Sequence, residues 1–203
     1  MSLKNTLNYL QFFKEVGKSK RLPRSGWVRE RIKDPESVAE HSFRIGALVM
    51  VLSDKFGYKL DKEKLLKMAL LVALGELATG DVVTGRGEYI DIKKRDEMER
   101  QERGGIKEMF DKIGDSEEYS AIYDEMIGRV TPEAKAFWQL DRIEMALQAL
   151  EYEEEQGKKL EEFFINTSLY LKEPLLKEIL GKIMRSRKKE YQKSLREKLE
   201  GKI

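Results

Sequence analysis

The chain has 203 residues, of which 40% are hydrophobic and 37% charged, a length and composition typical of one compact domain. It has no cysteine and one histidine, which excludes disulfides, thiolate nucleophiles, Cys-ligated metals and any metal site that needs two imidazoles. The net charge of +2 gives no overall pull towards nucleic acid. No uncharged stretch is long enough to cross a bilayer, and the N-terminus lacks a signal-peptide pattern. We therefore expect a cytoplasmic protein without a membrane segment.

Helical spacing of apolar residues dominates the chain, and no strand-like alternation exceeds four or five residues. Asp61 is a predicted N-cap, and the helix after it is apolar all round in its second half, which predicts a place at the domain centre. The sequence therefore predicts an all-α bundle of six to eight helices. The expected helices span Leu3–Val16, Ser37–Phe56, Asp61–Thr79, Lys93–Ile113, Glu117–Gly128, Thr131–Gln156 and Glu173–Leu199.

The C-terminal segment differs from the rest in charge. Residues 177–203 hold ten basic and four acidic side chains. We divide the chain into a main helical domain, 1–172, and a basic helix, 173–203, packed on that domain or extending from it. The basic helix could contact nucleic acid or an acidic partner. A solvated terminal helix is the favoured interpretation, and a nucleic-acid partner is not expected.

Four polar side chains lie where the pattern would place apolar ones. His41 begins a buried-looking helix, where a lone histidine is either a hydrogen-bonded core residue or a ligand. Glu76 follows the uncharged run 68–75, and glutamates are almost never buried without a partner. Asp81 could cap a loop. Asp141 lies among aromatic and aliphatic residues, as a buried acceptor or as the partner of a neighbouring arginine.

Glycine is also unusual at three places. Gly75, and the pair Gly104-Gly105, lie inside predicted helices, where each glycine costs about 0.5–1 kcal/mol relative to alanine. The stretch Thr84–Gly87 could hold a phosphate through backbone N–H groups and an arginine, although a surface loop is the favoured interpretation.

Six motifs follow one another in order within residues 8–154. They are Arg24-Ser25-Gly26-Trp27-Val28, Pro35-Glu36-Ser37-Val38-Ala39-Glu40-His41-Ser42, Lys67 through Glu76, Gly80-Asp81, Thr131-Pro132-Glu133-Ala134-Lys135 and Leu140-Asp141. Together these motifs resemble the HD-domain 5′-deoxynucleotidases. The resemblance implies an HD-domain helical bundle, a homodimer and a divalent cation such as cobalt or manganese. It also implies hydrolysis of a nucleoside 5′-monophosphate, with deoxy forms preferred.

The metal ligands that the resemblance implies are a histidine, a contiguous His-Asp pair and a distant aspartate. The first histidine corresponds to His41 and the distant aspartate to Asp141. The His-Asp pair corresponds to Val72 and Ala73, and neither side chain has a lone pair to donate. Two of the four protein donors are therefore missing.

The other site residues that the resemblance implies are all present. The catalytic glutamate corresponds to Glu76, and the aspartate that follows it to Asp81. Trp27 matches the tryptophan that crowds the ribose 2′ position, and Arg24 and Arg44 are the expected phosphate contacts.

The loss of two donors predicts a phosphohydrolase-like protein with weak or lost activity, because the ion activates the attacking water and stabilises charge on the phosphoryl group. Glu76, one turn from Val72, could become a third ligand, but it would then be unavailable as acid or base. The alternative is a non-catalytic nucleotide-binding or interaction protein on the same scaffold.

Overall fold

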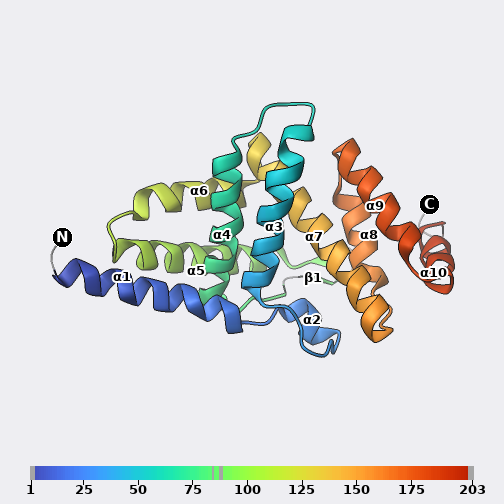
Figure 1. The fold of residues 1–203 in the computed structure, drawn as a ribbon, viewed down its shortest axis with the longest axis horizontal. Coiled ribbons are helices and arrows are strands. Elements are labelled where there is room, and N and C mark those ends of the chain that lie inside the picture. The colour runs from blue at the N-terminus through green and yellow to red at the C-terminus, as the bar shows by residue number, and fades with distance from the viewer. Residues whose placement is uncertain (1–2, 84, 87–88, 201–203) are drawn as a thin grey trace.

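The computed structural model describes residues 3–83, 85–86 and 89–200, and in that part the chain is all-α, as predicted (Figure 1). The only strands described, β1 (Gly85–Arg86) and β2 (Tyr89–Ile90), form one short antiparallel pair. Within those residues there are ten α-helices rather than six to eight, and none is long and apolar enough to cross a membrane. The helices are α1 (Leu3–Val16), α2 (Ser25–Arg29), α3 (Val38–Leu52), α4 (Lys62–Thr79), α5 (Ile92–Asp111), α6 (Ser116–Gly128), α7 (Pro132–Gln156), α8 (Glu161–Tyr170), α9 (Pro174–Ser186) and α10 (Lys189–Glu200).

Helix α4 lies at the centre of the bundle, as its apolar second half predicted. It packs against α3, α5, α6 and α7, and every residue from Leu71 to Glu76 is buried. The side chain of Asp61 caps its first turn by accepting a hydrogen bond from the backbone N–H of Lys64 at 3.0 Å. Gly80 ends the helix in the left-handed conformation, with φ of +82°, which suits glycine.

Two helices were missed in the sequence. Between the predicted helices Leu3–Val16 and Ser37–Phe56, where no helix was expected, lie a short 3-10 helix, Gly17–Arg21, and the five-residue helix α2, which is too short to show a periodic pattern. Helix α8 begins after Leu160 without a side-chain cap, so no local signal marks its start. Both helices matter for function, because they form one side of the cavity described below.

The predicted helix Glu173–Leu199 is wrong in its middle, where the chain leaves the helical conformation at Arg187 and separates α9 from α10. The guanidinium of Arg187 is buried, donates two hydrogen bonds of 2.7 Å to Glu153 on α7, and lies 4.2 Å from the ring centre of Phe164. A contact with a distant helix therefore overrides the local helical pattern. The division of the chain at residue 172 stays a prediction.

Candidate functional site

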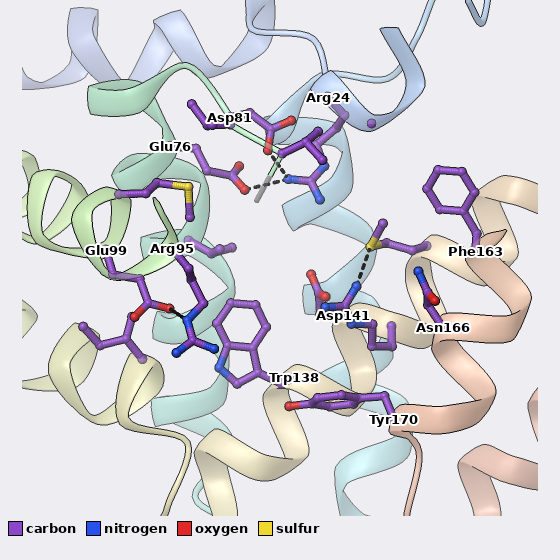
Figure 2. Close-up of a pocket in the computed structure, with 18 of the residues that line it drawn as sticks. Arg24, Glu76, Asp81, Arg95, Glu99, Trp138, Asp141, Phe163, Asn166 and Tyr170 are labelled. Atoms are coloured by element: carbon purple, nitrogen blue, oxygen red, sulfur yellow. Dashed lines mark hydrogen bonds and ion pairs between the residues drawn. The ribbon is translucent and has the colours of Figure 1, made fainter. Parts of the chain in front are cut away.

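A cavity of about 550 Å³ opens between α2, α4, α5, α6, α7 and α8 (Figure 2). Its volume lies in the range usual for small-molecule sites. Of the residues predicted for the site, six line this cavity, whereas His41, Ala73 and Arg44 do not. The six are Arg24, Trp27, Val72, Glu76, Asp81 and Asp141.

His41 lies directly behind the cavity wall, in the first turn of α3. Ser37 and Glu40 form a capping box that starts this helix, which places the imidazole against α7. The ring is fully buried, with Nε2 at 3.0 Å from Asp141 Oδ1 and Nδ1 at 2.5 Å from Glu144 Oε2. Burial alone would lower the pKa of His41, but its carboxylate partners raise it to about 10. A protonated imidazole donates from both ring nitrogens.

Asp141 is the point where this buried network meets the cavity. It is 4% exposed, and although burial raises its pKa, the hydrogen bond and charge of His41 lower it overall, with further contributions from Arg142 and Arg24. Asp141 and His41 are 100 residues apart in sequence, and the structure brings them into direct contact, so the pairing with a neighbouring arginine is not its only role.

The sequence analysis missed two carboxylates of the network, Glu144 and Glu36. Glu144 is three residues after Asp141 on α7 and hence on the same face, a signal that the sequence did contain. Its Oε1 accepts a hydrogen bond from Arg44 Nε at 2.9 Å. Arg44 also binds Glu151 at 2.7 Å and lies outside the cavity lining. These contacts give no support to a role for Arg44 in phosphate binding, which stays a prediction.

Glu36 is held beneath Trp27, whose indole N–H donates to Glu36 Oε1 at 2.7 Å. Burial, and the nearby charge of Glu144, raise the pKa of Glu36 to about 7. Trp27 is 1% exposed and stacks on Phe163 with ring centres 4.2 Å apart. The tryptophan is thereby fixed as a rigid part of the cavity wall.

Arg24, Glu76 and Asp81 form the polar end of the cavity, and Figure 2 shows them converging from three elements. Arg24 Nη1 donates to Glu76 Oε1 at 2.6 Å and to Asp81 Oδ1 at 2.8 Å. Asp81 also accepts from the backbone N–H of Ser25 at 2.5 Å, and its φ of +55° is strained for a non-glycine residue. All three residues were predicted for the site from the sequence, and the structure brings their side chains into contact.

Glu76 has an unusual environment for a carboxylate. Burial raises its pKa to about 8, with Arg24 opposing and Asp81 adding to the shift. Its Oε2 is buried and has no hydrogen-bond partner among the described residues. At neutral pH much of the population is therefore the protonated acid, which can donate a hydrogen bond at Oε2.

The α4 wall of the cavity is apolar where the resemblance places two ligands. Val72 and Ala73 are 6% and 4% exposed, and Val72 lines the cavity. Next to them, a Cβ on Gly75 would lie 3.1 Å from the ring of Tyr123, whose hydroxyl donates to Glu102 at 2.5 Å. Glycine at this position therefore makes room for a buried Tyr–Glu pair, which the sequence analysis missed because its members come from α6 and α5.

In the pair Gly104-Gly105, the glycine at position 105 is also explained by packing. A Cβ on Gly105 would lie 2.6 Å from the Cβ of Ala78, so this glycine lets α4 and α5 approach closely. Gly104 has nothing within 4 Å of its built Cβ. The stretch Thr84–Gly87, favoured as a surface loop, lies partly outside the described residues, which exclude Thr84 and Gly87.

Comparison with known proteins identifies the family of this chain. Residues 16–184 match a protein family described as HD domain. The 5'-deoxynucleotidase HDDC2 of Danio rerio is 36% identical over 86% of this chain and 84% of its own length, and that of Homo sapiens is 30% identical over 86% and 83%. The crystal structure of PH0347 protein from Pyrococcus horikoshii OT3 superposes with a TM-score of 0.68 at 32% identity, covering 88% of this chain and 99% of that one.

The chain belongs to the HD-domain family. Within that family it resembles the metal-dependent 5'-deoxynucleotidases, in agreement with the resemblance noted in its sequence.

Family membership suggests a divalent metal, and three donors close enough to share a cation are Glu36, His41 and Glu144, whose ligand atoms lie within 4.8 Å of one another. These donors are already used by other partners. Both nitrogens of His41 contact carboxylates, and Arg44 binds Glu144. On the cavity side, Val72 and Ala73 offer no donor. The residues present therefore do not fit the four-donor cage that the resemblance implies.

Proposed function

We propose that this protein binds nucleoside 5′-monophosphates in the cavity, with deoxy forms preferred, and that its phosphatase activity is weak or lost. The observation that carries this proposal is the apolar α4 wall, with Val72 lining the cavity where a metal ligand would lie. Without a bound ion, water keeps a pKa near 15.7 and is not activated as the attacking nucleophile.

The remaining site residues take roles in binding. Arg24 contacts the phosphate, because its guanidinium lies at the polar end of the cavity. Trp27 limits the space at the ribose 2′ position, and its stacking on Phe163 keeps the indole from moving away. In any residual hydrolysis, Glu76 and Asp81 handle the proton and the leaving-group oxygen.

The same proposal covers the metal. His41 and Asp141 alone do not hold cobalt or manganese tightly, because losing even a residue that only supports a ligand costs about 10–100-fold in affinity or activity. Elemental analysis of the purified protein after dialysis is expected to find less than one equivalent of transition metal. A stoichiometric ion retained through EDTA would contradict this.

The test of function measures binding and turnover separately. Calorimetry with deoxyadenosine 5′-monophosphate in EDTA is expected to show binding, whereas phosphate release stays at background with added cobalt or manganese. Glu76→Ala and Asp141→Ala serve as the comparison for turnover. Rapid phosphate release that either substitution abolishes would show that the site is an intact enzyme.

We further propose that the protein forms a homodimer through an apolar strip on α3 and α4. Phe43 is 81% exposed, Met50 and Leu70 are each 62% exposed, and α3 and α4 lie side by side (Figure 1). Phe43→Glu is expected to shift the mass measured by light scattering from dimer to monomer. The cytoplasmic location and the absence of a nucleic-acid partner stay predictions.

A further inference from the structure

The arginines of the cavity are not equivalent. Five line it, and four of them form ion pairs with carboxylates. The fifth, Arg142 on α7, has no carboxylate within ion-pair distance among the described residues. The four paired arginines are Arg24, Arg29, Arg95 and Arg129.

Arg142 is instead surrounded by soft and aromatic groups. Its Nη1 lies 3.8 Å from the sulfur of Met145, the contact dashed near Asp141 in Figure 2, and its guanidinium carbon lies 5.4 Å from the ring centre of Tyr170. These groups hold the side chain in place, but a thioether is only a weak acceptor. A half-buried guanidinium with five N–H donors thus keeps most of its hydrogen-bonding capacity for a ligand.

Arg24 also keeps donors for a ligand. Both of its ion pairs use the same nitrogen, Nη1, and within the described residues no partner is found for its Nη2 or Nε. In Figure 2 its guanidinium points from the polar end into the open space above Asp141. Arg24, Asp141 and Arg142 all line this cavity, so the two guanidinium groups face one shared space.

We propose that Arg24 and Arg142 together bind the phosphate of the ligand directly, in the space next to Val72, without a cation between phosphate and protein. Planar guanidinium groups match the geometry of phosphate oxygens, so two of them supply the charge that an ion would otherwise supply. Asp141 does not repel the phosphate strongly, because His41 donates to it from behind. This inference names the phosphate subsite of the proposed function and rests on it for the identity of the whole ligand.

The cavity offers a matched control for Arg142. Arg129 also lies over an aromatic ring, with its guanidinium carbon 4.6 Å from the centre of Trp138, but it is paired with Glu99 at 2.6 Å. Arg142→Met keeps an unbranched side chain and removes the charge and donors, together with the guanidinium contacts to Met145 and Tyr170. Arg129→Met makes the same chemical change at an arginine that the proposal leaves out. Circular dichroism and thermal unfolding confirm that both variants fold.

The experiment titrates wild type and both variants with inorganic phosphate and with deoxyadenosine 5′-monophosphate, in EDTA, by calorimetry. Arg142→Met is expected to weaken the binding of both by about 10–100-fold, the range for a lost hydrogen bond to a charged group. Arg129→Met is expected to change it less than threefold, and Arg142→Lys to recover part of the loss. Equal affinities in wild type and Arg142→Met, or phosphate binding that requires added manganese, would overturn the inference.

The two ligands separate this inference from the proposed function. Phosphate binding that depends on Arg142, with no gain in affinity from the nucleoside, supports the arginine pair and counts against a nucleotide ligand. Nucleotide binding that Arg142→Met leaves unchanged supports the proposed function and overturns the arginine pair.

Discussion

The two walls of the cavity differ in how completely their polar groups are satisfied. At the wall formed by α7, Asp141 and Glu144 are buried and each is bonded to His41, which lies behind that wall on α3. On the wall formed by α4, the buried side chains include the apolar Val72 and Ala73. The carboxylate of Glu76 on the same helix has a buried oxygen without a hydrogen-bond partner among the described residues.

The difference shows how the chain can keep the fold of its family with two apolar side chains at positions 72 and 73. A buried polar group is tolerated when another protein group satisfies it, and a buried position without such a partner is more stable when apolar. On α3 and α7 each group has a partner in the protein. At positions 72 and 73 of α4 the side chains are hydrocarbon, so these two positions add no buried charge.

The largest effect is expected from breaking the paired wall. His41→Leu leaves Asp141 and Glu144 buried without their shared donor, and removing one partner of a buried pair typically costs about 3–5 kcal/mol. Urea denaturation measures the free energy of unfolding. Arg103→Leu, which removes an exposed ion pair with Asp124, is the control and is expected to have little effect. Equal losses in the two variants would show that the His41 network is not stabilising.

Restoring donors to the apolar wall is expected to create a metal site. The double variant Val72→His/Ala73→Asp restores both donors. Manganese at about 100 times its Kd for this variant should raise the free energy of unfolding of the variant by about 2.7 kcal/mol. Wild type, measured alongside, should show no such increase. Thermal unfolding with manganese and with EDTA makes the comparison. A variant that folds and gains no stability from manganese would mean that His41 and Asp141 are not placed to share an ion.

Glu76 predicts a pH dependence confined to the polar end of the cavity. Its pKa rises from 4.5 to about 8 on folding, so the folded state binds more protons and its stability falls as pH rises between those values. Glu76→Gln cannot ionise and should lack this fall, with a difference of about 4 kcal/mol between pH 5 and 9, since one unit of pKa shift corresponds to about 1.4 kcal/mol. Urea denaturation from pH 5 to 9 measures it. Parallel curves for wild type and variant would show that Glu76 does not titrate in this range.

The smallest expected effects come from the glycine pair between α4 and α5. Gly105→Ala places a Cβ 2.6 Å from Ala78 and should destabilise by about 1–3 kcal/mol through overpacking. Gly104→Ala meets nothing within 4 Å and should stabilise by about 0.5–1 kcal/mol through helix propensity. Thermal unfolding of the two variants compares them, and effects of the same sign would contradict the close approach of α4 and α5.

Local patterns in the sequence predicted much of the fold. Capping residues such as Asp61, and apolar periodicity, located most of the long helices, because both are set by neighbours within one or two turns. Helix α8 was missed because it has no side-chain cap, and the break at Arg187 was missed because its cause is Glu153 on another helix. These errors lie where tertiary contacts decide the local structure.

For the site, the sequence by itself determined which groups are present: one imidazole, no thiol, and hydrocarbon at positions 72 and 73. It also determined that the chain resembles the HD-domain nucleotidases. Only the tertiary structure decided which groups are partners. That Glu144 bonds to His41, and that Arg142 faces Tyr170 and forms no ion pair among the described residues, depends on how α3, α7 and α8 pack together. A side chain's partners are set by distance in space, and helix packing brings residues 100 positions apart within 3.0 Å.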